Sequence, residues 1–303
     1  MTTPSPFAAD LGRFLVQQAS VTVAGADTVY WSYGSPAADT VLVVVHGFRG
    51  EHHGLEPVIA RLLASGTDVR VIAPDLPGFG ASPPMVTHRH DIDGYAAWLE
   101  EFLGALRLRG SALVLGHSFG SIVAAAAVAA GLSTPLLVLI NPIGASALAG
   151  PRGVLTRLAV EYYRLCAILP RTLGVRLLSN RLIVRAMSVV MVTTKEPALR
   201  RFVHDQHDRY FSVFASRDTL LEAFRALVSH DVSEYAARIS ASTLLIAAAQ
   251  DDVTPLAAQY RLLEKLPHAQ LQVIDGVGHL IHYEKPDEAA TLLAAALNER
   301  IRQ

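Results

Sequence analysis

Residues 112–141 read ALVLGHSFGSIVAAAAVAAGLSTPLLVLIN, and this segment decides the fold. Two short apolar runs, Ala112–Leu115 and Leu136–Ile140, are bounded by turn residues, a pattern typical of strands buried on both faces. The Ala-rich run Ile122–Leu132 between them is long enough for a helix. The segment therefore predicts a strand, a sharp turn, a helix and a second strand, all of them buried.

From Ser111 to Pro151 the sequence contains no Asp, Glu, Lys or Arg, which raises the question of a membrane span. A spanning helix needs about 20 consecutive apolar residues. Turn residues interrupt the apolar runs here, at residues 116–118 and again at 131–135. We therefore expect no transmembrane segment. We also expect no signal peptide, because Asp10 and Arg13 interrupt the N-terminal sequence.

The composition of the 303 residues excludes several classes of protein. The chain is 51% hydrophobic and 17% charged, and its net charge of −1 gives it no general attraction for nucleic acid. The single cysteine, Cys166, excludes internal disulfides and a cysteine-based metal site. It also favours a reducing, cytoplasmic location. A chain of this length can bury an ordinary hydrophobic core.

Outside the central segment, short apolar runs alternate with helical patterns. This alternation predicts an α/β protein with a mostly parallel sheet and helices on both faces. The expected strands are 21–24, 29–33, 41–45, 69–73, 243–248 and 271–274, and the expected helices are 56–65, 91–108, 256–266 and 287–301. Residues 152–238 break the alternation, since their apolar residues fall at helical spacing. They predict a helical insertion between two strands.

The pentapeptide Gly116-His117-Ser118-Phe119-Gly120 has the pattern G-x-S-x-G and stands between the buried strand and the Ala-rich helix. A nucleophile elbow requires this context, because a sharp strand-to-helix turn projects the serine hydroxyl out of the sheet. Small flanking residues allow close packing, and the helix N-terminus adds positive potential. We predict that Ser118 is a nucleophile rather than an ordinary buried serine in a turn.

His279 is the best candidate for the base that a serine nucleophile needs. It follows strand 271–274 in a loop with glycines, which brings it to the same sheet edge as Ser118. We expect His117 to pack beside the elbow. We expect most other histidines to face solvent: His52, His53, His88, His90, His204 and His207. The His204/His207 and His279/His282 spacings occur in metal sites, but without further ligands we expect no metal.

An acidic residue must orient the base, and two adjacent candidates follow strand 243–248. Asp251 and Asp252 both fit the chain order serine, aspartate, histidine. We favour Asp251 and keep Asp252 as the alternative acid, and one of the two could instead cap the next helix. Asn141 stands at the other common position for this acid, but it carries no carboxylate.

An oxyanion hole needs two preorganised N–H donors. Phe119, the residue after Ser118, is expected to supply one. Phe48 lies in His46-Gly47-Phe48-Arg49-Gly50, directly after strand 41–45, and is expected to supply the other. The alternative is that this stretch is only a glycine-rich turn.

Together these motifs resemble the α/β-hydrolase fold family, in its branch with a helical cap. The resemblance covers nearly the whole chain through residues 46–48, 75–82, 116–120, Asp251 with Pro255, 278–279 and 284–286. It implies an eight-stranded sheet with a triad of Ser118, His279 and Asp251, and oxyanion donors at Phe48 and Phe119. It also implies a core domain of 1–142 and 237–303, with a cap at 143–236 inserted after strand 6. The chain departs from the family's usual glycine at Ala248 and Ser121 and from its usual proline at Ser242.

These features predict a serine hydrolase that cleaves a carboxylic ester or related acyl bond through an acyl-enzyme, without any cofactor. The substrate would be a small molecule, with a hydrophobic acyl group. Two alternatives come from other classes. One is a C–C bond hydrolase, a lyase or a cofactor-free haloperoxidase with the same triad, and the other is a ligand-binding protein on a hydrolase scaffold.

The insertion has a basic excess, with nine arginines and one lysine between Arg152 and Arg201 against Glu161 and Glu196. These cations could meet an anionic substrate or make peripheral contact with a membrane, but an ordinary solvated face is the simpler interpretation. The apolar residues of the insertion could line a hydrophobic pocket or only pack its helices together. These residues are Ile183, Met187, Val189, Val190, Met191, Phe202, Phe211, Phe214 and Phe224.

Overall fold

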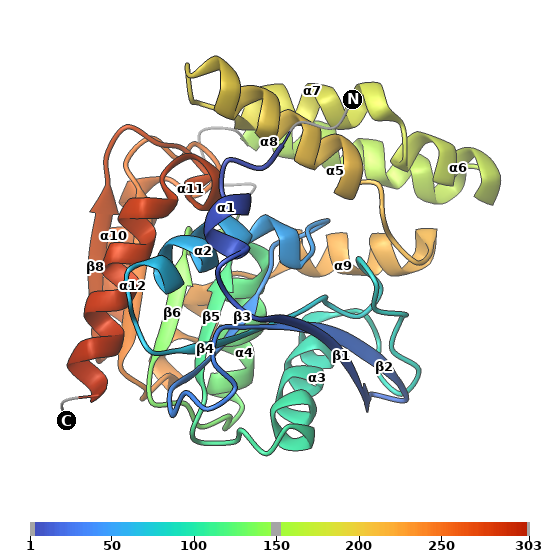
Figure 1. The fold of residues 1–303 in the computed structure, drawn as a ribbon. Helices are drawn as coiled ribbons and strands as arrows, with labels where there is room; N and C mark the ends of the chain where they lie inside the picture. Colours follow the sequence, from blue (N-terminus) through green and yellow to red (C-terminus); the bar gives the residue numbers. More distant parts are fainter. Residues whose placement is uncertain (1–3, 147–152, 302–303) are drawn as a thin grey trace.

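A computed structural model describes residues 4–146 and 153–301, and its centre is one eight-stranded sheet (Figure 1). The strand order is β1-β2-β4-β3-β5-β6-β7-β8. β1 pairs with β2 and β2 with β4 in antiparallel fashion, and every later pair is parallel. The strands are β1 (Val16–Val23), β2 (Ala26–Tyr33), β3 (Val41–Val45), β4 (Arg70–Pro74), β5 (Leu113–His117), β6 (Leu137–Ile140), β7 (Thr243–Ala248) and β8 (Ala269–Ile274). The expected eight-stranded, mostly parallel sheet is confirmed.

Helices cover both faces of this sheet, which explains the low charge of its central strands. One face packs against α3 (Ile92–Ala105), α4 (Phe119–Ala129) and α10 (Leu256–Lys265). The other face packs against α2 (Glu56–Ala64) and α12 (Pro286–Ile301). Every residue of β5, β6 and β7 is buried. A parallel sheet covered on two sides therefore accounts for the charge-free central segment.

Several element boundaries differ from the sequence expectation. β1 and β2 are longer than expected because they pair as an edge hairpin whose β1 residues are mostly exposed and lack an apolar signal. α4 begins at Phe119 rather than at residue 122, directly after the turn at Ser118. Three short elements were not expected: α1 (Ala8–Leu11), η1 (His52–Gly54) and α11 (Ile281–Glu284).

Between β6 and β7 the described residues form five helices, called here the inserted helices. They are α5 (Gly153–Ile168), α6 (Arg171–Leu178), α7 (Arg181–Met191), α8 (Pro197–Tyr210) and α9 (Arg217–Ser229), followed by η2 (Val232–Glu234) and η3 (Ala236–Arg238). Figure 1 shows α5 to α8 gathered at one end of the molecule, with α9 between them and the sheet. Side chains of Asn180 and Ser216 cap α7 and α9 by accepting from backbone N–H groups.

None of the helices within the described residues has both the length and the apolar character that crossing a membrane requires.

Candidate active site

Ser118 occupies a tight turn between the end of β5 and the start of α4. Its φ of 52° lies in the left-handed region, which costs a non-glycine residue about 1–2 kcal/mol. Two neighbouring glycines make this turn possible. A Cβ on Gly116 would come within 2.3 Å of the Gly120 carbonyl, and a Cβ on Gly120 within 2.2 Å of the Val45 carbonyl. The glycines therefore let α4 and β3 close around a strained serine.

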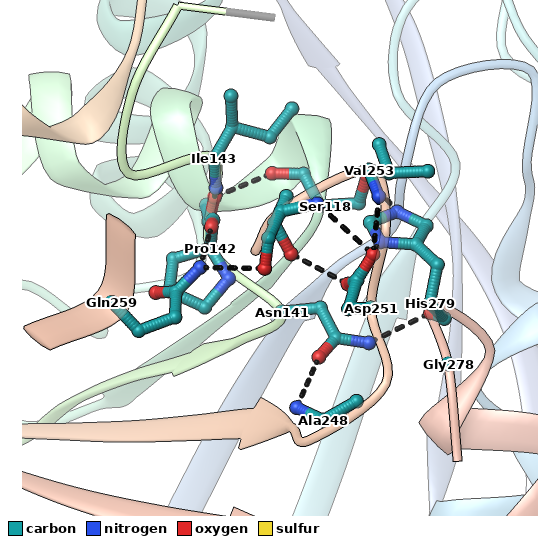
Figure 2. Close-up of polar contacts among 12 residues, drawn as sticks. Ser118, Asn141, Pro142, Ile143, Ala248, Asp251, Val253, Gln259, Gly278 and His279 are labelled. Carbon is teal, nitrogen blue, oxygen red and sulfur yellow. Dashed lines mark hydrogen bonds and ion pairs between the residues drawn. The ribbon is translucent and has the colours of Figure 1, made fainter. Parts of the chain in front are cut away.

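Ser118, His279 and Asp251 form a continuous chain of hydrogen bonds (Figure 2). The Nε2 atom of His279 lies 2.9 Å from Ser118 Oγ, and its Nδ1 atom lies 2.7 Å from Asp251 Oδ2. The three side chains come from loops after β5, β7 and β8, and all three are buried. Because Asp251 can only accept, His279 donates from Nδ1 and its Nε2 accepts from the serine hydroxyl.

Asp251 is held by more than the histidine. Its Oδ1 accepts from the N–H groups of Val253 at 2.7 Å and Thr254 at 2.9 Å, and its Oδ2 accepts from the Thr254 hydroxyl at 2.5 Å. Burial alone would raise the pKa of this carboxyl, but His279 and these donors lower it to about 2. Asp251 is therefore a carboxylate at neutral pH. Asp252 is exposed and lines the neighbouring cavity.

Asn141 supports the histidine loop, a role that sequence reasoning missed. Its Nδ2 donates to the His279 carbonyl at 2.7 Å, and its Oδ1 accepts from the Ala248 N–H at 3.1 Å (Figure 2). Asn141 thereby links the ends of β6 and β7 to the loop that carries His279. Its place directly after β6, at the edge where Ser118 emerges, was the signal that could have found it.

The loop after β3 lies directly against the turn that holds Ser118. A Cβ on Gly47 would come within 3.2 Å of His117 Nδ1 and 3.4 Å of Ser118 Cβ, so the backbone approaches the serine closely. The next residue is Phe48, which lines the cavity. Phe119 is the first residue of α4, so its N–H has no acceptor within the helix. Both expected N–H donors therefore belong to backbone beside Ser118.

The expectation of solvent-facing histidines was wrong for His52, His90, His204 and His207, which are all buried. Each has a bonded partner that makes burial tolerable. His52 bonds Asp75 at 2.9 Å, and His90 bonds the Tyr95 hydroxyl at 3.0 Å. His204 and His207 share one partner, the Ser188 hydroxyl, at 2.6 and 2.7 Å.

His117 packs beside the elbow, as expected, with its ring centroid 4.1 Å from that of His282. Burial lowers the pKa of His117 to about 3 and also lowers the pKa of His282. Both rings are therefore neutral at pH 7. They therefore place no positive charge beside the nearby His279.

One group of potential metal ligands occurs among the described residues: Glu51, His52 and His53, whose ligand atoms lie within 4.8 Å of one another. Two of its nitrogens already have acidic partners. His52 Nδ1 bonds Asp75, and His53 Nδ1 bonds the Glu51 carboxylate. These contacts explain the cluster as a hydrogen-bonded network at the start of α2.

A cavity of about 320 Å³ opens onto Ser118 and His279. Its walls are mostly apolar and come from the inserted helices, the loop after β3, the loop after β7 and the segment from His279 into α11. Met187, Val190, Met191, Phe211 and Phe224, which the sequence suggested for a pocket, all line it. Arg49 is the one arginine among the described lining residues, and no lysine is among them. The basic excess of the insertion faces away, since the arginines of α5 to α7 are all exposed, while Arg152 lies outside the described residues.

Comparison with protein families agrees with this fold. A family model described as "Alpha/beta hydrolase family" matches residues 42–292. The chain is also 27% identical over 278 residues to a 2-hydroxy-6-oxononadienedioate/2-hydroxy-6-oxononatrienedioate hydrolase of Cupriavidus pinatubonensis. That match covers 87% of this chain and 84% of the relative.

Solved structures with lower sequence identity share the fold. An esterase from Exiguobacterium antarcticum superposes with a TM-score of 0.75 at 18% identity, covering 93% of this chain and 100% of the esterase. A membrane phospholipase A superposes with a TM-score of 0.74 at 20% identity, covering 98% of this chain and 90% of the other.

Proposed function

The chain belongs to the α/β-hydrolase family, and from that premise we propose that it is a serine hydrolase cleaving carboxylic esters with a neutral, hydrophobic acyl group. The observation that carries the proposal is the bonded chain Asp251–His279–Ser118 at the floor of an apolar cavity. A strained serine, a base within 2.9 Å and a buried carboxylate are the parts that acyl transfer needs.

In the proposed reaction, His279 Nε2 takes the proton of Ser118 as its oxygen attacks the ester carbonyl. The oxyanion that forms is bound by the N–H groups of Phe48 and Phe119. Asp251 stabilises the imidazolium, which then gives its proton to the leaving alcohol. Water activated by His279 attacks the acyl-enzyme, releases the acid and restores the Ser118 hydroxyl.

We assign the inserted helices the role of a cap over this site. In this division residues 143–236 form the cap, and residues 1–142 and 237–303 form the catalytic core. The cap supplies most of the apolar cavity wall, including Tyr163 and Phe224, which stack with ring centroids 3.7 Å apart. It would therefore select the acyl or alcohol group while the core performs the chemistry.

The charges around the cavity favour a neutral substrate. Two carboxylates, Glu51 and Asp252, line it. The guanidinium of Arg49 donates to two backbone carbonyls and one tyrosine hydroxyl, so it is already engaged by the protein. Besides His279, three histidines line the cavity, His46, His117 and His282, and burial lowers the pKa of each so that they stay neutral. An anionic acyl group would meet little positive charge here.

The second candidate is hydrolysis of a C–C bond, which the name of the Cupriavidus relative raises. That name specifies a dioate, a substrate with two carboxylates. The cavity charges of this chain argue against such a substrate, although the same three residues could serve either reaction. Haloperoxidase or lyase activity and simple ligand binding remain alternatives to be tested with it.

A fluorophosphonate probe tests whether Ser118 is an activated nucleophile. We expect the wild-type protein to be labelled and Ser118→Ala to be silent, with kcat for a p-nitrophenyl ester lower by a factor on the order of 10⁶. Absence of labelling in the wild type would favour a binding protein. Near wild-type turnover by Ser118→Ala would refute the assigned nucleophile.

A substrate panel then separates the reaction types. It pairs neutral p-nitrophenyl esters of increasing chain length with a matched ester that ends in a carboxylate and with a vinylogous diketone dioate. We expect the highest kcat/KM for the neutral esters. Preference for the dioate would assign C–C hydrolysis instead.

A further inference from the structure

Arg49 is a buried arginine with an unusual set of partners. Its side chain is among the largest fully buried ones, and it directly follows Phe48 in the loop after β3. Its Nε donates to the Phe211 carbonyl at 2.7 Å, its Nη1 to the Tyr163 hydroxyl at 3.0 Å and its Nη2 to the Leu178 carbonyl at 2.6 Å. All three acceptors belong to the insertion.

The charge of this guanidinium is balanced without a carboxylate among its described partners. Leu178 is the last residue of α6, and Phe211 directly follows α8, so both carbonyls lie at the C-terminal ends of helices. Those ends carry partial negative charge. The Phe214 ring adds a cation–π contact, with the guanidinium carbon 5.8 Å from its centroid. Two helix ends and an aromatic face therefore hold one cation between them.

The backbone conformation of Arg49 is also constrained by its surroundings. Its φ of 59° is left-handed, a conformation that persists in a non-glycine residue only where its surroundings enforce it. The turn is closed by the Gly50 N–H donating to the Gly47 carbonyl at 3.0 Å. Phe48 lies inside that turn. The position of its N–H therefore depends on a loop whose side-chain anchor is in the inserted helices.

We infer that Arg49 is a positioning residue that couples the inserted helices to the oxyanion hole. This inference rests on the proposed ester hydrolysis. The guanidinium of Arg49 holds the Phe48 N–H close to Ser118 only while α5, α6 and α8 pack over the cavity. The hole is then complete when the cap is closed, and loosening the cap weakens binding of the transition state more than binding of the ester.

The test compares Arg49→Met with Arg217→Met as a matched control. Arg217 also donates to a backbone carbonyl near a helix end, that of Leu169 at 2.9 Å, but its described bonds stay within the insertion. Each variant is assayed for kcat and KM with a short neutral p-nitrophenyl ester and for the inhibition constant of an acyl trifluoromethyl ketone. The ketone adds to serine and places its oxyanion in the hole, so it reports on the hole directly.

We expect Arg49→Met to lower kcat by about 10- to 100-fold, which is the range for a misplaced hydrogen-bond donor. The inhibition constant of the ketone should rise by a similar factor. The KM of Arg49→Met should change by less than about threefold. Arg217→Met should keep the inhibition constant of the ketone near the wild-type value. Arg49→Lys, with the charge but without the planar fork, should fall between them and decides the question if Arg49→Met does not fold.

Two results would overturn the inference. One is an Arg49 variant that loses thermal stability but keeps the wild-type kcat and ketone affinity. The other is Arg217→Met lowering both values as strongly as Arg49→Met. Ester hydrolysis by the wild-type protein is measured before any variant is compared. If the wild type hydrolyses no ester, the proposed function itself is refuted.

Discussion

Asp251→Asn is the most discriminating change at the candidate site, because it keeps the shape of the side chain and removes only its charge. In the wild type, Asp251 receives four hydrogen bonds, one from His279 and three from Val253 and Thr254. An asparagine can keep the two backbone donors on its oxygen. Its amide N–H₂ then faces His279 Nδ1 at the position where Asp251 Oδ2 now accepts.

The expected loss follows from the tautomer that this arrangement forces. With a donor facing Nδ1, His279 is stable as the Nε2–H tautomer, which cannot take the proton of Ser118. The equivalent change in a serine protease triad lowers kcat by about 10⁴, or about 5 kcal/mol of transition-state stabilisation. We expect a loss of that size here, because His279 Nδ1 and Asp251 Oδ2 lie 2.7 Å apart and both side chains are buried.

The assay is steady-state hydrolysis of a neutral p-nitrophenyl ester near pH 8, with Asp252→Asn measured beside it. Asp252 is exposed, so we expect its substitution to lower kcat by far less than that of Asp251. Circular dichroism and a thermal melt show that both variants are folded. Asp251→Asn retaining kcat within tenfold of wild type, or Asp252→Asn showing the larger loss, would refute the assignment of the acid.

Three further outcomes are expected. Gly47→Ala should lower kcat by about 10- to 100-fold, because the new Cβ would crowd His117 Nδ1 at 3.2 Å and Ser118 Cβ at 3.4 Å. An unchanged kcat would show that the loop after β3 can move away from Ser118 without loss of activity. Val190→Trp should reduce kcat/KM for an octanoate ester relative to a butyrate ester by about tenfold or more, since Val190 lines the cavity; an unchanged ratio would place the acyl chain elsewhere. Burial lowers the pKa of both His117 and His207 from 6.5 to about 3. The unfolded chain then binds more protons between those pH values, so the free energy of unfolding should fall as the pH drops below about 6.5 towards 3. Calorimetric Tm values from about pH 7.5 to pH 4.5 test this, and a constant Tm would contradict it.

The sequence predicted the features that depend on local pattern. The strand–turn–helix around Ser118 could be predicted because β5 and β6 are short apolar runs, the turn contains glycines and the helix between the strands is rich in alanine. The position of His279 near Ser118 could be predicted because the carboxyl ends of parallel strands lie at one edge of a sheet. These inferences need only periodicity and order along the chain.

Patterns left a choice open where two chemically similar residues differ only in where they point. Asp251 and Asp252 are neighbours with the same side chain, and only the path of the loop after β7 brings Asp251 Oδ2 to His279. Four of the histidines expected at the surface, His52, His90, His204 and His207, were buried for a related reason. His204 and His207 lie on one helix, α8, but their shared partner Ser188 lies on α7, and no local signal pairs the two helices.

The sequence by itself thus determined the sheet, the elbow and the order of the candidate catalytic residues, since each follows from burial along one strand or helix. Only the tertiary structure decided which carboxylate meets His279, that Asn141 ties the histidine loop, and that Arg49 reaches acceptors 114 to 162 residues away. Contacts at such separations depend on how the inserted helices pack over the sheet. That packing is a property of the whole chain, so no short stretch of sequence encodes it.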